Sequence, residues 1–538
     1  MDTNRNMKKK LTRKKLSREK RVSYTGATLQ RKATFRYALI AEGIGVGVLA
    51  GLVVSLFRYI LAEAETVRTI LIEASGQKLL MALFSVGLLI CMLIGAAFIT
   101  GREPVSGGSG IPQVEAELKG KLNPRWTRTA FAKFFGGLMA IGGGLSLGSE
   151  GPSVQLGAMM GKGFSRMNKR LKTEEKLLLT AGAGAGLATA FGAPLAGVVF
   201  TLEELHKNFS KEVLLTTMAA SITADCIASY IFGLKPVFEF AVSGGLPLER
   251  IWMVLILGVI LGLLGVLYNK TTFLIQDVLS KIHPAVTRLL IPFVMVMILV
   301  FAIPEAIGSG ADLIEPAGEG VFGVKFLAAL LAVKFVTSLV SFGTGLPGGT
   351  FLPMLVLGAL IGGLYAELLG PAAGYSESYA EYFVILGMAG YFGAIVRAPI
   401  TGVILISEMT GTFSNLLPLS MVVLVAYMTA DVLKGGPLYE QLTDRLISGG
   451  KADYSNQKHK VLIESRVHLG SAMDERPLSE IDLPEGCLVV SVSRGHREVV
   501  PHGGTVIKAG DKLVVLCDEA RLMEAQQELD DRCHKIVR

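Results

Sequence analysis

Two glycine-rich stretches about two hundred residues apart repeat one another, and they constrain the fold more than any other feature. They are Gly142–Gly161 and Gly343–Gly362, and at a fixed offset of 201 nine of their twenty positions are identical. A second pair, Ala193–Glu204 and Ala398–Met409, matches at five of twelve positions. Glycine and proline thus interrupt apolar sequence at corresponding places in two halves. In a membrane protein this pattern indicates an ion site built from broken helices near the middle of the bilayer.

The composition is too apolar for a soluble protein of this size. Of the 538 residues, 51% are hydrophobic and 18% charged, and the mean hydropathy is +0.51. Other apolar segments are shorter and stop at Gly or Pro, which lipid allows only where protein or a water-filled cavity covers the freed backbone. We therefore expect an all-α polytopic membrane protein. The runs close to the roughly 20 residues of a spanning helix are Tyr37–Leu61, Leu79–Thr100, Ile251–Leu274, Leu289–Ile303 and Leu416–Leu433.

Positive charge is concentrated at the start of the chain. Residues 1–36 hold thirteen Lys and Arg against Asp2 and Glu19, a net charge of +11, whereas the whole chain carries +8, which leaves the rest near −3. Positive charge directly before a first span holds that segment in the cytoplasm and favours contact with anionic lipid. This placement argues against nucleic acid as a partner, and the segment lacks the apolar core and cleavage site of a signal peptide.

The chain divides into four predicted parts. In the last part, Cys487–Val492 and Lys512–Leu516 alternate like strands, and Glu519–Ile536 is typical of an amphipathic helix, which together predict a small α/β domain. The five cysteines are scattered and form neither a metal motif nor a disulfide framework, which suits a reducing cytoplasmic setting. The parts are a basic tail (1–36), a membrane domain (37–447, with halves of about 37–233 and 248–447), a polar linker (448–459) and a soluble domain (460–538).

Three glycine-rich breaks are candidates for an anion site: 108–112, 148–152 and 349–353. Proline just inside a helix start costs no hydrogen bond, and the free amides of that end favour an anion. One helix end contributes about 0.3–2 kcal/mol, whereas burying a bare ion costs on the order of 20 kcal/mol in the idealised limit. Several ends must therefore converge. The alternative, given equal weight, is that these glycines allow close helix packing.

Positions that break the internal repeat are candidates for function. Glu150 corresponds to Phe351 and Glu204 to Met409, whereas Glu203 corresponds to Glu408 and is therefore expected to be structural. An ionisable residue at membrane depth is a functional hypothesis by default. A carboxylate at Glu150 would compete with an anion for the same amides, and its protonation would admit the anion, which couples the two movements.

Two further charged positions carry open alternatives. Lys133 lies in an apolar stretch, where it either raises the local potential for anions or pairs with a carboxylate. We expect Arg397 and Glu408 to form a structural pair or to lie at the membrane interface.

Five motifs in order resemble those of the CLC chloride channels and chloride/proton exchangers over roughly residues 37–447. They are GSGIP (108–112), GSEGP (148–152), GTFLP (349–353), APLAGVVFTLEE (193–204) and Pro437–Leu438–Tyr439. The resemblance implies two inverted repeats of broken helices, a homodimer with one pore per protomer, a plasma-membrane location and cytoplasmic termini.

The resemblance also implies roles for individual residues. Glu150 is the external gating glutamate, Glu204 the internal proton-transfer glutamate, and Glu203 helps to hydrate the proton path. A glutamate at position 204 is typical of exchangers, and serine at position 109 suits chloride. The implied chloride ligands are the hydroxyls of Ser109 and Tyr439 and the amides of Thr350 and Phe351, with Gly110, Ile111, Gly148, Ser149 and Gly151 around them. One departure is Ser149, where the family usually has Arg or Lys; the outer pore is therefore less positive.

The stretch Val461–Leu516 resembles the C-terminal subdomain of RCK (regulator of potassium conductance) proteins, less specifically than the pore motifs resemble theirs. That resemblance implies a regulatory dimer domain with a small nucleotide effector, such as a cyclic dinucleotide; a passive assembly module is the alternative.

The function predicted from these features is chloride/proton antiport. The rivals are a passive voltage- or proton-gated chloride channel on the same fold, and a ligand sensor whose membrane part is the regulated output. An enzyme is not expected, because the G-x-S-x-G match at Gly144–Gly148 follows apolar helix rather than a strand. The seven histidines form no metal-ligand spacing, and no cofactor is expected.

Overall fold

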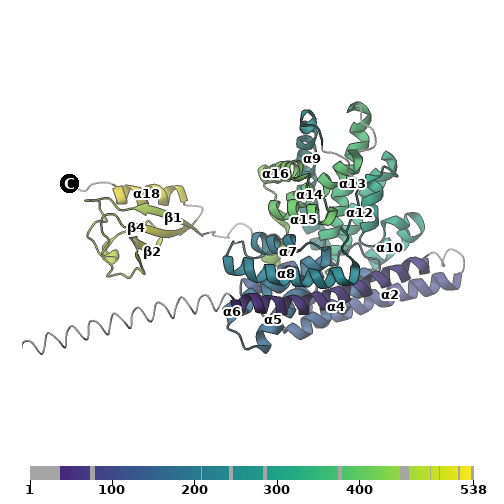
Figure 1. The fold of residues 1–538 in the computed structure, drawn as a ribbon, viewed down its shortest axis with the longest axis horizontal. Helices are drawn as coiled ribbons and strands as arrows, with labels where there is room; N and C mark the ends of the chain where they lie inside the picture. Colours follow the sequence, from purple (N-terminus) through teal and green to yellow (C-terminus); the bar gives the residue numbers. More distant parts are fainter. Residues whose placement is uncertain are drawn as a thin grey trace, which may run out of the picture. The chain divides into compact units, whose positions relative to one another are not determined.

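The chain forms two compact units, Met1–Gly450 and Lys451–Arg538. The computed structural model describes residues 37–72, 79–207, 209–240, 246–282, 287–373, 379–448, 460–484, 486–495, 497–518 and 522–534. The predicted basic tail (1–36) and, apart from residue 448, the predicted linker lie outside these described residues. Figure 1 shows that the first unit is built of helices and the second of a sheet with one helix.

Within the described residues, six helices are long and apolar enough to cross a membrane. Their outward faces carry exposed apolar side chains, among them Leu52 and Leu263, which are unfavourable in water and favourable in lipid. The helices are Tyr37–Ile72, α2 (Leu79–Arg102), α8 (Lys211–Phe232), α9 (Ile251–Ser280), α12 (Val324–Gly343) and α13 (Phe351–Ala373).

Shorter helices fill the rest of this unit. The α-helices are α3 (Ile111–Leu118), α4 (Trp126–Gly142), α5 (Glu150–Met167), α6 (Lys172–Phe191), α7 (Pro194–Phe200), α10 (Leu290–Ala302), α11 (Ile314–Gly318), α14 (Ala380–Val396), α15 (Pro399–Thr410), α16 (Leu416–Val432) and α17 (Leu438–Ile447). A π-helical turn, Thr201–Leu205, continues α7. Single 3-10 turns are Pro104–Ser106, Leu248–Arg250, Thr287–Leu289, Pro304–Ala306 and Ala311–Leu313.

Two segments that the sequence suggested were of spanning length form shorter helices. Helix α10 has 13 residues and ends just before Pro304, and α16 has 17 residues and ends before Gly435. At 1.5 Å per residue, 13 residues reach only about 20 Å, short of the roughly 30 Å hydrocarbon core.

The two halves of this unit form inverted repeats. Gly148 and Gly349, which correspond in the sequence repeat, exchange two backbone hydrogen bonds of 2.7 Å in an antiparallel bridge. The segment before α5 and its counterpart before α13 therefore run in opposite directions where they meet.

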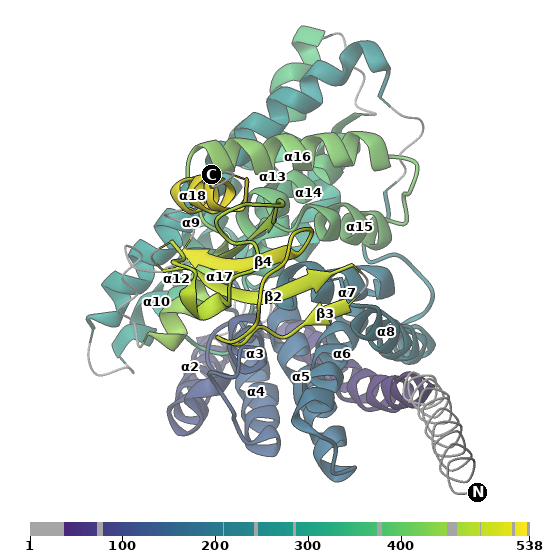
Figure 2. The same ribbon diagram turned by 90° about the vertical axis from the view of Figure 1, so that its left-hand side faces the viewer.

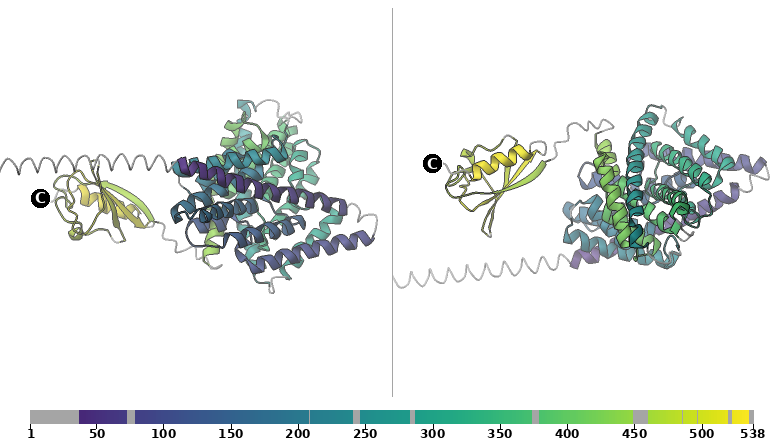
Figure 3. Two further views of the ribbon diagram at one scale, coloured as in Figure 1. Left: turned by 60° about the horizontal axis from the view of Figure 1, so that its bottom comes forward. Right: turned by 90° about the horizontal axis from the view of Figure 1, so that it is seen from above.

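Glycines in helix interiors serve close packing. A side chain at Gly157 of α5 would collide with the Gly182 carbonyl of α6, and one at Gly358 of α13 with the Gly387 carbonyl of α14. Helices α5, α6, α13 and α14 therefore form a tightly packed centre, and α14 is buried along its whole length. These glycines lie outside the three breaks, and they allow the helix backbones to approach closely. The same holds for α9, where Gly262 packs on Thr429 of α16, and these two helices lie side by side (Figure 3).

The second unit is a four-stranded antiparallel sheet of order β1-β4-β2-β3 (Figure 2). In β1, Ile463 pairs with Val515 of β4, and both side chains are buried beside Leu529 of α18. The strands are β1 (Lys460–Arg466), β2 (Leu488–Arg494), β3 (Arg497–Val499) and β4 (Lys512–Asp518), and the helix is α18 (Leu522–His534). The sequence predicted β2, β4 and α18 but did not single out β1 and β3.

Candidate functional site

The first glycine-rich break forms a tight loop before α3. Gly108 and Gly110 have φ angles of +63° and +105°, a region that favours glycine. The Gln113 side chain ties the loop by donating to the Gly107 carbonyl (2.7 Å) and accepting from the Gly110 amide (2.9 Å). Ser109 is thereby held on a fixed bend directly ahead of the α3 N-terminus.

The three breaks meet at one place. A methyl group at Gly151, in the first turn of α5, would lie 2.6 Å from Ser109 Oγ, and one at Gly349 would lie 3.0 Å from the Gly151 amide nitrogen. Together with the Gly148–Gly349 bridge, these contacts bring the starts of α3, α5 and α13 together. The helix ends predicted to converge on an anion do converge, and their free amides and dipoles favour negative charge there.

Glu150 is the first residue of α5 and is buried, with 2% of its surface exposed. Its carboxylate lies near two backbone amides, its own and that of Leu352 in the first turn of α13. A side chain at Gly148 would collide with Oε2 of this carboxylate. The carboxylate therefore occupies the place toward which the helix ends point, where it takes amides that an anion would otherwise bind.

Buried hydroxyls without partners lie at this site. Ser109 Oγ and Tyr439 Oη are both buried and have no hydrogen-bond partner, and Glu150 Oε2 has none either. Tyr439, in the first turn of α17, interacts electrostatically with both Glu150 and Glu204. A buried hydroxyl with no acceptor is costly, so a bound anion would satisfy groups that the protein leaves unsatisfied.

The predicted ligands Thr350 and Phe351 stand at the start of α13. The Thr350 hydroxyl is already engaged, 2.5 Å from the Tyr268 hydroxyl, which leaves the backbone at this position for an anion. The buried Phe351 ring packs between Phe191 and Phe392, with ring centroids 5.2 Å and 4.7 Å away. The aromatic counterpart of Glu150 in the repeat is thus part of the core.

Glu204 lies in the π-helical turn Thr201–Leu205 and is buried, with its Oε1 atom unpartnered. Its charged neighbours are Lys207, Glu115 of α3 and Glu440 of α17. Lys207 Nζ lies 3.0 Å from Glu440 Oε2 and 3.7 Å from Glu115 Oε1. Sequence reasoning missed this group because its members come from three separate segments; the only local signal was Glu115, an acidic residue in a short apolar helix.

Glu203 and Glu408 form a reciprocal pair of helix caps. Glu203 accepts from the amides of Ile400 (3.1 Å) and Thr401 (2.7 Å) at the start of α15. Glu408 accepts from the amides of Leu195 (3.0 Å) and Ala196 (2.7 Å) at the start of α7. Each half of the chain thus supplies a carboxylate to the free amides of a helix in the other half.

The expected pair between Arg397 and Glu408 is not formed. Arg397 instead donates to the carbonyls of Tyr427 (2.8 Å) and Gly435 (2.6 Å), while Glu408 is committed to the α7 cap. The pairing alternative was wrong because the backbone amides that bind Glu408 do not show in the side-chain pattern; the alternative of a location at the membrane interface stays a prediction.

Lys133 holds the first loop rather than pairing with a carboxylate. Its buried Nζ donates to the carbonyls of Ser106 (3.0 Å) and Gly108 (2.7 Å). Lys334 does the same in the second half, donating to the carbonyls of Ala306 (3.2 Å) and Gly308 (2.8 Å). The second half therefore carries a counterpart of the first loop at Gly308–Gly310, which the sequence comparison missed because its offset is 200 rather than 201.

No metal centre is indicated: among the residues the structure describes, no group of three or more His, Cys, Asp and Glu side chains is placed to hold a metal ion. The described cysteines are free thiols.

Comparison with known proteins matches both units. Residues 87–431 match the voltage gated chloride channel family, and residues 462–530 match the TrkA-C domain. The H(+)/Cl(-) exchange transporter ClcA of Vibrio cholerae serotype O1 (strain M66-2) is 36% identical over 432 residues, covering 77% of this chain and 91% of the relative. The ClcA of Salmonella paratyphi B (strain ATCC BAA-1250 / SPB7) is 33% identical over 441 residues, covering 79% and 92%.

Solved structures share the fold of the first unit. A slow cyanobacterial Cl-/H+ antiporter superposes with a TM-score of 0.71 at 28% identity, covering 76% of this chain and 98% of that one. A CLC-type fluoride/proton antiporter superposes with a TM-score of 0.62 at 23% identity, over 75% and 97%, a likeness of fold. With its inverted repeats, its converging helix starts and these relatives, the chain belongs to the voltage-gated chloride channel (CLC) family, with a C-terminal TrkA-C domain.

Proposed function

We propose that this protein is a chloride/proton antiporter. The observation that carries the proposal is the position of Glu150. Its carboxylate lies where the starts of α5 and α13 meet, and the next residue, Gly151, packs on the unpartnered hydroxyl of Ser109. An anion and this carboxylate would therefore compete for the same binding position. The names of the relatives, H(+)/Cl(-) exchange transporters, support the choice of chloride and protons.

The chemistry follows from charge. Ionised Glu150 is attracted by the helix ends and excludes the anion; once protonated, it loses that attraction and leaves the amides to chloride. Ser109 and Tyr439 then donate their hydroxyls to the ion. Because the ligands are amides and hydroxyls rather than Arg or Lys, the site releases its ion readily.

Glu204 is proposed as the internal proton acceptor. It is buried without a partner on Oε1, and Tyr439 stands in electrostatic contact with both glutamates. Lys207, Glu115 and Glu440 place charged side chains around it and give protons a polar approach. Glu203 accepts hydrogen bonds from the α15 amides through both carboxylate oxygens, and it adds a charge next to Glu204 along this approach. Lys133 supports the site by fixing the Ser109 loop.

The setting is proposed as follows. The protein is a homodimer in the cell membrane with both termini in the cytoplasm, and the basic tail contacts anionic lipid. The membrane domain covers 37–447 and the TrkA-C-like domain 460–538, joined by a linker at 448–459. The soluble domain is regulatory and takes a small nucleotide, such as a cyclic dinucleotide.

The decisive experiment is the reversal potential of purified protein in liposomes under combined chloride and pH gradients. An antiporter shifts its reversal potential with pH, whereas a passive channel follows the chloride Nernst potential alone, and that second outcome would replace the proposal. Glu150→Gln should pass chloride without moving protons uphill, because its neutral side chain no longer exchanges a proton. Glu204→Gln should also stop proton flux while chloride still moves, and the matched control Glu408→Gln, whose carboxylate caps α7, should retain coupling.

A further inference from the structure

A basic side chain of the first helix lies within electrostatic range of Glu150. Arg58 interacts electrostatically with Glu150 and with Asp225 of α8. Its guanidinium donates to the Thr189 carbonyl near the end of α6 and stacks on the Phe232 ring, 4.4 Å from the centroid. A carbonyl and a ring orient a guanidinium without cancelling its charge.

This charge is uncompensated by an ion pair. Among the residues that the structure describes, no carboxylate lies within 4.0 Å of Arg58, and Asp225 Oδ1 is buried without a hydrogen-bond partner. Ser149, immediately before Glu150, carries no charge. Arg58 is therefore the positive side chain that acts on the Glu150 carboxylate.

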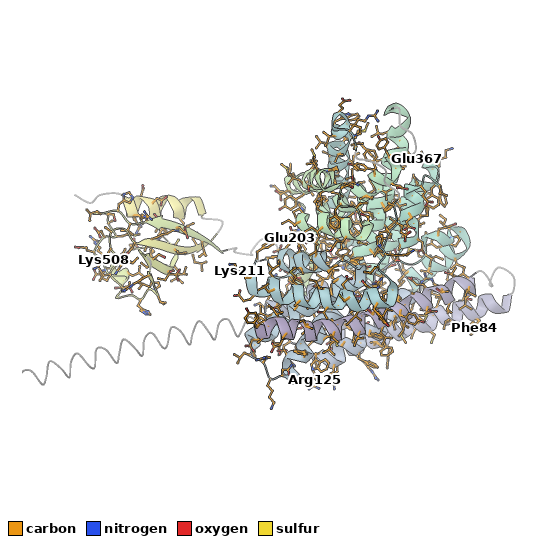
Figure 4. All side chains as sticks on the ribbon, in the orientation of Figure 1. Phe84, Arg125, Glu203, Lys211, Glu367 and Lys508 are labelled. Carbon is orange, nitrogen blue, oxygen red and sulfur yellow. The ribbon has the colours of Figure 1, made fainter. Side chains whose placement is uncertain are left out.

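Arg58 also lines a cavity of about 400 Å³. The cavity opens at the Phe232 end of α8, whereas Lys211 begins that helix at the other end, on the side that also carries Glu203 (Figure 4). A 22-residue helix is about 33 Å long, so the cavity and the Glu204 group lie on opposite faces. Gly192 in the cavity wall follows Phe191, whose ring packs on Phe351 at the start of α13. One wall of the cavity is thus next in sequence to a residue that packs on the start of α13.

We propose that this cavity is the outer entrance of the anion path and that Arg58 is its anion-attracting residue. The inference rests on the proposed transport of chloride. It adds a positive charge near the gate, which Ser149 does not supply. A fixed positive charge in the cavity wall, within electrostatic range of Glu150, raises the local anion concentration in front of the gate. Asp225 and Glu408, which line the same cavity, act with the opposite sign.

The test is chloride transport as a function of chloride concentration, measured in right-side-out and inside-out membrane vesicles holding the full chain. Arg58→Gln should raise the half-saturating chloride concentration at the Phe232 face about fivefold, with little change in maximal rate and little change at the opposite face. Arg58→Lys should restore most of the apparent affinity, and Asp225→Asn should lower the half-saturating concentration about twofold. These differences should shrink when an inert salt screens the charges.

The matched control is Lys235→Gln, which removes an exposed charge from the rim of the same cavity and should have little effect. The inference is overturned if Arg58→Gln leaves the half-saturating concentration unchanged, or changes it equally at both faces. Should Arg58→Gln fail to fold, Arg58→Lys and Asp225→Asn still decide, because a purely structural role predicts no decrease for Asp225→Asn. Loss of proton coupling in the wild-type protein would contradict antiport, yet the chloride dependence would still test Arg58.

Discussion

A side chain at position 148 would occupy the place where the Glu150 carboxylate lies. Gly148 has an ordinary negative φ angle, so alanine is tolerated by the backbone there. Gly148→Ala should displace the gate side chain from the amides and allow chloride to pass with fewer protons exchanged per ion. The measurement is the coupling ratio from reversal potentials, together with the pH dependence of chloride flux, which should become flatter.

The control is the symmetric variant Gly349→Ala. Its methyl group would press on the backbone of Gly148 and Gly151 at 3.0–3.4 Å but would not touch the Glu150 carboxylate. A loss of stability that both variants share would come from a weakened Gly148–Gly349 bridge between the halves. An unchanged coupling ratio in Gly148→Ala, or an equal loss in both variants, would contradict a specific effect on the gate.

Among single residues, the sequence indicated best those that leave a mark in the local pattern. Glu150 and Ser109 were placed correctly at the meeting point of the helix ends, because glycine, proline and a lone carboxylate leave a mark in the sequence. Lys133 was interpreted less well: its partners are main-chain carbonyls, which no side-chain pattern reveals. Glu115 and Lys207 were missed because only the fold brings them beside Glu204.

At the scale of elements, the exchange of helix caps ties the two halves together. Glu408→Gln keeps the shape of the cap but removes the negative charge from the α7 N-terminus. Hydrogen bonds to charged groups contribute about 1.5–3 kcal/mol, so this variant should unfold at lower temperature while its coupling ratio stays unchanged. Thermal unfolding in detergent and reversal potentials in liposomes check the two parts of the prediction.

Glu203→Gln is the matched variant on α15. If Glu203 serves only as a cap, Glu203→Gln should lower the unfolding temperature as much as Glu408→Gln does and should leave the coupling ratio unchanged. If Glu203 also serves the proton path beside Glu204, Glu203→Gln should in addition lower proton flux, whereas Glu408→Gln should not. Stability unaffected by either change would contradict the caps as a source of stability.

At the scale of the whole molecule, the sequence predicted the two-part organisation and the internal repeat, because hydropathy changes abruptly along the chain and glycine recurs at a fixed interval. It could not predict the direction of one repeat against the other from the residues alone; the antiparallel Gly148–Gly349 bridge supplies that. Helix lengths such as that of α10 depend on where the chain bends in space. The strand β1 was missed because its pairing partner β4 lies some fifty residues away.

The compact second unit has an acid-sensitive ion pair of its own. Burial alone would raise the pKa of Asp511, but hydrogen bonds from Arg494 (2.7 and 2.8 Å) and from the Lys508 amide (2.9 Å) outweigh it and hold the pKa below its usual 3.8. A carboxyl whose folded-state pKa is depressed stabilises the fold above the unfolded value, and that stabilisation is lost as pH falls through the folded value. The contribution of this pair to the stability of the second unit should therefore be lost as pH falls from about 3.8, the unfolded value, through the lower folded value.

Hydrogen exchange of β1 and β4 amides in the full chain, corrected for intrinsic rates between about pH 5 and about pH 2.5, measures this loss. At about pH 5, Asp511→Asn should be less stable than the wild type. Between about pH 3.8 and about pH 2.5 its stability should change much less with pH than that of the wild type. Glu464→Gln is the control: it removes an exposed partner of Lys512, and an exposed pair contributes little. In Asp511→Asn, position 511 binds no proton in either the folded or the unfolded state. If this variant still loses stability with acid as the wild type does, another carboxyl controls the acid sensitivity of the unit.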